Sequence, residues 1–228
     1  MRKETIKKLP NRITMLRIIL VILFIPALLF NEIMTGFMGK IIKSFRTNAD
    51  FMAMGLSYIA LFLFVVAAIS DFLDGYIARK YNVVSNFGKI MDPLADKILV
   101  ISALLGFIQL GIVPAWMVII IIGREFLVSG IRIIAAQEGK IIAASRLGKV
   151  KTVTEITAII AILILLCINN TVIYLNITSS AGMPDSTVME ISLLKIAPYW
   201  LMFIAAAVSL VSGFEYYFKN KKLFEKEL

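Results

Sequence analysis

Long apolar stretches alternate with short polar connections along the chain, a pattern that is typical of helices that cross a lipid bilayer. A helix needs about 20 mostly apolar residues to span the bilayer core. Six stretches approach or reach this length, at residues 13–30, 51–69, 90–110, 115–134, 153–168 and 196–218. The pattern therefore predicts an all-α integral membrane protein with six transmembrane helices, in a single membrane domain that covers residues 1–228.

The connections between these stretches differ in length. Residues 31–50 and 169–195 form two long connections. Between the third and fourth stretches, Gly111 and Pro114 predict a tight turn that carries no charge. Residues 1–9 are basic and lead directly into the first stretch, so we expect a basic amphipathic segment at the membrane surface, followed by an uncleaved first span.

The basic residues are distributed unevenly about the six stretches. When both termini are placed on one side of the membrane, all but four of the 24 lysine and arginine residues belong to that side. The exceptions are Lys40, Lys43, Arg46 and Lys195. The positive-inside rule then predicts that both termini, and the connection after the second span, are cytoplasmic. This bias accounts for the net charge of +9 without a nucleic-acid partner.

The composition narrows the chemistry that the chain can carry out. Hydrophobic residues make up 60% and charged residues 17%, whereas soluble domains are about half apolar and a quarter charged. Histidine is absent, which removes the usual zinc and copper ligands and the usual general base. The single cysteine, Cys167, lies in an apolar stretch and is expected to be a packed thiol. Acid–base chemistry must therefore use carboxylate, lysine, tyrosine or metal-bound groups.

Four aspartates occupy the facing ends of the second and third stretches. Asp71 and Asp74 are three residues apart, and Asp92 and Asp96 are four apart, so each pair shares one face of a helix. A carboxylate within a membrane span costs about 2.5–3.5 kcal/mol, and four that converge also repel one another. Divalent cations would compensate for both costs. Ligands that are all oxygen favour Mg²⁺ or Mn²⁺ and leave Ca²⁺ as an alternative, and two ions would neutralise the four charges.

Small and basic residues accompany these aspartates. Gly75, Ala78 and Gly88 leave room for a ligand to approach the two helices, although small residues also mediate ordinary helix packing in membranes. Arg79 presents a forked guanidinium that suits a diphosphate. The combination indicates a site for a nucleotide diphosphate beside the aspartates.

Residues 71–96 read Asp-x2-Asp-Gly-x2-Ala-Arg-x8-Gly-x3-Asp-x3-Asp, which resembles the complete signature of the CDP-alcohol phosphotransferase family. The resemblance implies six transmembrane helices, commonly a homodimer, and an active site at the cytoplasmic face of the plasma membrane. It also implies transfer of a substituted phosphoryl group from a CDP-linked donor to an alcohol, with release of CMP. The metal ligands that it implies are Asp71, Asp74, Asp92 and Asp96, with Asp96 also the catalytic base.

Two further segments are similar to the phosphatidylglycerophosphate synthases, one branch of that family. They are residues 123–132 with 143–152, and the opening Pro10-Asn11-x2-Thr14-x2-Arg17. This similarity implies CDP-diacylglycerol as the donor, glycerol 3-phosphate as the acceptor and membrane lipids as the surroundings. The expected donor-binding residues are Asp74, Gly75, Ala78, Arg79, Gly88, Asn11 and Thr14.

Basic residues after the fourth stretch suit the phosphate of such an acceptor. The expected contacts are Arg124, Arg132, Lys149 and Lys151. Arg124 and Arg132 are eight residues apart, about two helical turns, so they can share a face. The same cations are also explained by topology, by anionic lipid headgroups, or by pairing with Glu125 and Glu155.

Other functions remain open at this stage. Within the family, the acceptor can instead be inositol phosphate, serine, choline or phosphatidylglycerol. A divalent-cation transporter would also carry acidic residues in its spans, but it should place them near the bilayer midplane rather than at one edge. A non-catalytic scaffold has no need for all four acids.

Overall fold

The computed structural model describes residues 14–30, 46–81, 86–140, 142, 145–178 and 185–221. It describes side chains for residues 14–30, 51–70, 95, 97–140, 142, 145–175 and 196–221. Within these ranges the regular secondary structure is helical. This confirms the all-α prediction for the described part of the chain.

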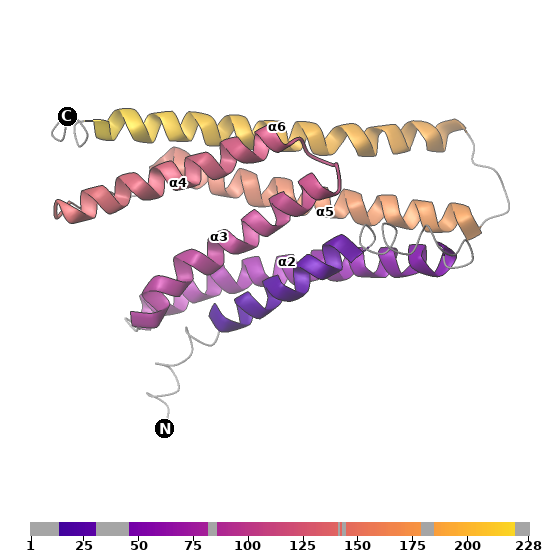
Figure 1. The fold of residues 1–228 in the computed structure, drawn as a ribbon, viewed down its shortest axis with the longest axis horizontal. Helices are drawn as coiled ribbons and strands as arrows, with labels where there is room; N and C mark the ends of the chain where they lie inside the picture. Colours follow the sequence, from indigo (N-terminus) through magenta and orange to yellow (C-terminus); the bar gives the residue numbers. More distant parts are fainter. Residues whose placement is uncertain are drawn as a thin grey trace, which may run out of the picture.

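A helix over Thr14–Phe30 is followed by five longer helices that run back and forth (Figure 1). These are α2 (Arg46–Tyr81), α3 (Asn86–Gln109), α4 (Ala115–Gln137), α5 (Arg146–Thr178) and α6 (Asp185–Asn220). Helix α5 packs against both α6 and α2, and α4 packs against α6. The end of α2, the start of α3, the end of α4, the start of α5 and the end of α6 all lie at the same end of the bundle (Figure 1).

Three of the described helices contain a stretch that is long and apolar enough to cross a membrane. These stretches are Phe51–Ser70, Arg146–Leu175 and Ile196–Asn220. Shorter apolar segments occupy Thr14–Phe30 and Lys97–Gln109. Many large apolar side chains are exposed, among them Phe62 and Ile119, as expected where lipid rather than water surrounds the helices. The chain is therefore a membrane protein, while six spans and the orientation of the termini stay predictions.

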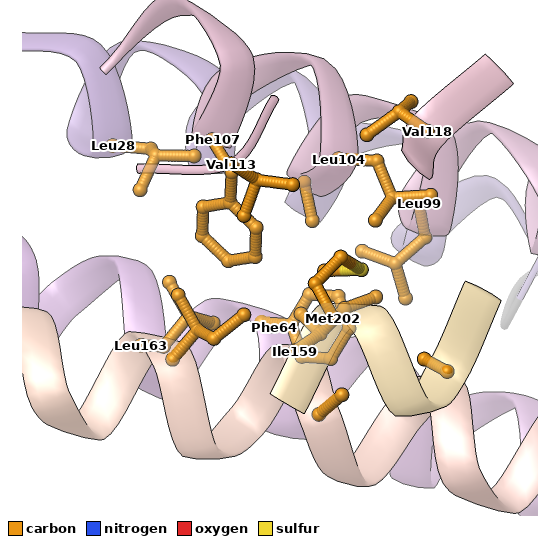
Figure 2. Close-up of a cluster of buried hydrophobic side chains, with 14 of the residues drawn as sticks. Leu28, Phe64, Leu99, Leu104, Phe107, Val113, Val118, Ile159, Leu163 and Met202 are labelled. Carbon is orange, nitrogen blue, oxygen red and sulfur yellow. The ribbon is translucent and has the colours of Figure 1, made fainter. Parts of the chain in front are cut away.

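The core draws on all the described helices. Figure 2 shows part of this cluster, in which apolar side chains from helices far apart in the sequence face one another. Phe24 and Phe64 are fully buried, and their ring centroids lie 5.7 Å apart. Each of the six described helices contributes buried residues to this cluster, for example, in chain order, Phe24, Phe64, Leu104, Val118, Ile159 and Met202. Since lipid is as apolar as these side chains, close packing contributes more to this association than removal from water.

The predicted tight turn between the third and fourth stretches is confirmed. Helix α3 ends at Gln109 and α4 begins at Ala115, with Pro114 at its N-cap. Gly111 has a φ of 67°, a backbone conformation that side chains disfavour. The amide of Ile112 donates to the carbonyl of Phe107 at 3.0 Å.

The predicted long connections proved partly wrong. Helix α5 continues to Thr178 and α6 starts at Asp185, so most of residues 169–195 is helical. No glycine or proline interrupts residues 169–178, and the hydroxyl of Thr171 donates to the carbonyl of Cys167 within the helix. Helix α2 likewise begins at Arg46, inside the other predicted connection. The rest of that connection and the basic segment 1–9 lie outside the described residues.

Candidate active site

The four aspartates lie on two consecutive helices at one end of the bundle. Asp71 and Asp74 fall in the last three turns of α2, and Asp92 and Asp96 in the first three turns of α3. The two helices contact one another and run in opposite directions (Figure 1). Four residues join Tyr81 to Asn86, so these helix ends lie within about 18 Å of one another. The backbone thus brings the two pairs to the same region, while their side chains lie outside the described set.

Five of the seven expected donor-binding residues, Asp74 among them, belong to these ends of α2 and α3. Gly75, Ala78 and Arg79 belong to α2 and Gly88 to α3, with side-chain positions outside the described set. Asn11 precedes the described residues. Thr14, which begins the first described helix, is fully buried, and so is Arg17 one turn later.

A network of paired charges joins α4, α5 and α6 close to this end. Arg124 Nη1 lies 2.9 Å from Glu125 Oε1, and Lys151 Nζ lies 2.6 Å from the same oxygen. Lys151 also forms an ion pair with Glu155, one turn along α5. Arg124 Nη2 donates to the Ser212 hydroxyl of α6 at 2.8 Å. Glu125 is therefore the acid that links the cations of two helices.

The burial of this network explains why its charges are paired. The Lys151 and Glu155 side chains are 3% and 4% exposed, and the Arg124 side chain is 9% exposed. A buried charge is tolerated when an opposite charge and hydrogen bonds compensate for its lost hydration. The pairing of the basic run with Glu125 and Glu155, which the sequence left open, is thus present for Arg124 and Lys151.

Arg132 and Arg124 share the face of α4 that contacts α6. Arg132 Nε donates to the Tyr216 hydroxyl at 3.2 Å, and its guanidinium lies 5.6 Å from the centre of that ring. Ser212 and Tyr216 are one turn apart on α6, while the two arginines are two turns apart on α4. The expectation that the two arginines share a helix face is confirmed.

Gly213 makes room for Arg124, whereas Gly148 lies at ordinary contact distance from it. A Cβ atom on Gly213 would lie 3.0 Å from Arg124 Cγ, and one on Gly148 would lie 3.5 Å from Arg124 Nη2. Ser212, Gly213 and Tyr216 were not predicted from the sequence. A polar Ser-Gly pair within an apolar span, followed one turn later by tyrosine, was the available signal.

The last expected acceptor contact, Lys149, lies apart from this network. It is exposed near the start of α5, and in the described part of the chain it takes part in no ion pair. Its ammonium is therefore accessible, unlike that of Lys151.

A cavity of about 50 Å³ opens between α3, α4 and α5 beside the charge network. Its polar lining consists of Lys97, Glu125, Lys151, Thr152 and Glu155. Lys97 Nζ donates to the Ser129 hydroxyl at 2.5 Å, and that hydroxyl donates to the Glu125 carbonyl at 2.7 Å. Lys97 was not predicted from the sequence either, although it directly follows Asp96 and is a lysine within an apolar helix.

The fold and the polar network define a helical membrane protein with a charged site at one end of its bundle. The sequence model of the CDP-alcohol phosphatidyltransferase family matches residues 7–211, and the chain belongs to this family. It is an enzyme, a transferase of phospholipid biosynthesis.

Several similar proteins share one printed name within this family. The CDP-diacylglycerol–glycerol-3-phosphate 3-phosphatidyltransferase of Bacillus subtilis is 42% identical over 157 residues, which cover 68% of this chain and 76% of the relative. The enzyme of the same name from Rickettsia felis is 34% identical over 218 residues, 96% of this chain and 98% of the relative. The enzyme of the same name from Mycoplasma pneumoniae is 37% identical over 156 residues, which cover 68% of this chain and 66% of the relative.

Members of this family generally use divalent metal ions. The four aspartates suit such ions, since they offer only carboxylate oxygens from two helices that meet at one end of the bundle. Among the described side chains, no group of three or more acidic, histidine or cysteine residues forms a metal site. Glu125 and Glu155 are instead neutralised by lysine and arginine.

Proposed function

We propose that the chain transfers the phosphatidyl group of CDP-diacylglycerol to sn-glycerol 3-phosphate, giving phosphatidylglycerophosphate and CMP. The observation that carries this proposal is the similarity to synthases with this printed activity, which extends over 96% of the chain for the Rickettsia felis enzyme. The basic residues of α4 and the start of α5 add physical support, because the acceptor is a phosphate ester and Lys149 among them is exposed.

Asp71, Asp74, Asp92 and Asp96 would hold Mg²⁺ or Mn²⁺, in the two-ion arrangement that four carboxylates suit. The bound metal would stabilise negative charge on the diphosphate. The donor-binding residues extend from these aspartates along α2 and α3. The proposed set is Asp74, Gly75, Ala78, Arg79 and Gly88, with Asn11 and Thr14 from the start of the chain.

Asp96 is the proposed catalytic base. It takes the proton of the acceptor hydroxyl while the hydroxyl oxygen attacks the β-phosphorus of the donor. The bond from that phosphorus to the oxygen of CMP then breaks, and CMP leaves with its phosphate near Arg79. Because an ordinary aspartate is a weak base, the close approach of the two substrates must supply much of the rate.

The acceptor phosphate is assigned to the basic residues of α4 and the start of α5. Arg124, Arg132 and Lys149 are the proposed contacts. Lys151 belongs to the same set, but two carboxylates already surround its ammonium. Its contribution is therefore to hold Glu125, and through Glu125 the guanidinium of Arg124.

The membrane arrangement follows from the charge distribution. We propose six spans in a single domain, cytoplasmic termini, and an active site at the cytoplasmic face of the plasma membrane. The common placement of the aspartates and the basic residues at one end of the bundle supports this orientation (Figure 1). A homodimer is proposed from the family resemblance alone.

A direct assay tests the reaction. Purified protein in detergent micelles that contain CDP-diacylglycerol and Mg²⁺ is supplied with labelled glycerol 3-phosphate, and lipid-linked label and CMP are measured. Equal amounts of both are expected. Inositol phosphate, serine, choline and phosphatidylglycerol are supplied in parallel, and preference for any of them would overturn the acceptor assignment. The protein is also reconstituted in liposomes that contain Mn²⁺. Release of this Mn²⁺ without any formation of CMP would indicate a transporter instead.

A further inference from the structure

Helices α3 and α4 form a V that is closed at one end and open at the other. The short turn after Gln109 closes it, and from there the two helices diverge toward the end that carries the aspartates (Figure 1). The carboxylates of α3 and the arginines of α4 thus lie on different arms of this V. The angle between the arms decides how the two halves of the proposed site face one another.

One side-chain contact bridges the arms. Lys97 on α3 donates to Ser129 on α4 at 2.5 Å. Lys97 lies 12 residues before Gln109 and Ser129 lies 14 residues after Ala115, so both are roughly 20 Å from the turn. The contact therefore joins two residues that lie at similar distances from the turn, one on each helix.

Each of the two bridging residues is linked to a residue that belongs to the proposed site. Lys97 directly follows Asp96, the proposed base. The Ser129 hydroxyl donates to the carbonyl of Glu125, whose carboxylate binds Arg124 and Lys151. Lys97 also lines the cavity between α3, α4 and α5 with Glu125 and Lys151.

The hydrogen-bond partner of Lys97 differs in kind from the partners of Lys151. A charged side chain in a membrane helix is costly, and the buried Lys151 nearby is neutralised by two carboxylates. Among the described residues, the hydrogen-bond partner of Lys97 is a neutral hydroxyl. The Lys97–Ser129 contact is thus a polar link between α3 and α4 beside the proposed site.

We propose that Lys97 is a positioning residue, which through Ser129 sets the distance between the Asp96 segment of α3 and the acceptor-binding segment of α4. This inference rests on the proposed function. A displacement of reacting groups by about 1 Å can lower a rate roughly a hundredfold. Loss of the bridge should therefore lower kcat and leave both KM values nearly unchanged, because each substrate keeps its own contacts.

A double-mutant cycle tests this role, with steady-state kinetics of Lys97→Met, Ser129→Ala and the double variant. Each single variant should lower kcat about 10- to 100-fold with KM values within about threefold, and the double variant should be no worse than the poorer single one. Lys97→Arg, which keeps a donor, should retain most of kcat. Matched controls are Ser102→Ala, whose hydroxyl donates to the Ile98 carbonyl of its own helix, and Lys140→Met, an exposed residue three positions beyond the end of α4.

A distance measurement separates this inference from the proposed function. Spin labels at the exposed positions 98 and 126, in a Cys167→Ser background, report the α3–α4 separation in the intact protein. The distance distribution should broaden in Lys97→Met and in Ser129→Ala. Unchanged distances with unchanged kcat, multiplicative kinetic effects, or a defect confined to Lys97→Met would overturn the positioning role. Absence of turnover in the unmodified protein would instead overturn the proposed function.

Discussion

The Lys151 ammonium on α5 lies 2.6 Å from the Glu125 carboxylate on α4, and this ion pair joins two helices inside an apolar bundle. Glu125 also holds Arg124, and Arg124 reaches Ser212 on α6. Three helices are thus connected through one chain of charged groups. This connection holds the guanidinium of Arg124, which is proposed to bind the acceptor phosphate.

Lys151→Met should lower the thermal stability of the protein. The substitution leaves the Glu125 and Glu155 carboxylates without their shared cation, and removal of one partner from a buried ion pair costs about 3–5 kcal/mol. Thermal unfolding in detergent, followed by circular dichroism, measures the loss. The double variant Lys151→Met/Glu155→Leu should recover part of it, because it also removes a buried charge. Lys219→Met is the control, since Lys219 is exposed and pairs with Glu215 at the surface of α6.

Gly106→Val should destabilise the packing of the first described helix on α3. A Cβ atom at Gly106 would lie 2.4 Å from Leu28 Cδ2, and overpacking of this kind costs about 1–3 kcal/mol. Gly55→Val is the matched control, because a Cβ at Gly55 meets nothing within 4 Å. The midpoint of thermal unfolding should fall for the first variant by clearly more than for the second. Equal shifts would show that helix propensity, not contact with Leu28, determines the effect.

Lys149→Ala should weaken the binding of the acceptor. Lys149 is exposed and takes part in no ion pair in the described part of the chain, so its loss should not disturb the fold. A hydrogen bond to a charged group contributes about 1.5–3 kcal/mol, which predicts a KM for glycerol 3-phosphate that is at least about tenfold higher. The KM for CDP-diacylglycerol should stay within about twofold. Lys140→Ala is the control, and an unchanged acceptor KM in both Lys149→Ala and Arg124→Ala would contradict the proposed phosphate site.

Asp96→Asn should abolish turnover while CDP-diacylglycerol binding survives. The amide keeps the size of the side chain but cannot accept the proton of the acceptor hydroxyl. Donor binding is measured by equilibrium binding of labelled CDP-diacylglycerol, and turnover by CMP release. Turnover close to that of the unmodified protein would show that another group is the base.

Removal of divalent cations should abolish CMP formation, and added Mg²⁺ or Mn²⁺ should restore it. The four aspartates repel one another without a counter-charge, so thermal stability should also rise when the cation is added back. This rise should be smaller in Asp71→Asn, which has one ligand fewer. Full activity after exhaustive chelation would contradict the metal assignment.

The family and its chemistry could be predicted from the sequence because they depend on local features. The spacing of Asp71, Asp74, Asp92 and Asp96 needs only helix periodicity to place each pair on one face. The absence of histidine limits the metal ligands, and the Gly111–Pro114 segment predicted the turn before α4. Helix lengths were harder, because hydropathy marks where a bilayer can lie but not where backbone hydrogen bonding stops. Helix α5 therefore runs past its predicted span to Thr178.

The partners of the charged side chains were decided only by the tertiary structure. The i,i+4 spacing of Lys151 and Glu155 marks one ion pair in the sequence. The sequence does not show that Lys151 is buried between this carboxylate and Glu125 of α4, whereas Lys149 is exposed two residues earlier. The choice follows from how α5 rotates against α4 and α6, and this rotation is set by packing around residues such as Ile159 and Met202. The contacts of Arg124 with Ser212 and of Lys97 with Ser129 likewise join residues 88 and 32 positions apart. Contacts of this kind depend on how whole helices pack, and a one-dimensional pattern does not contain that information.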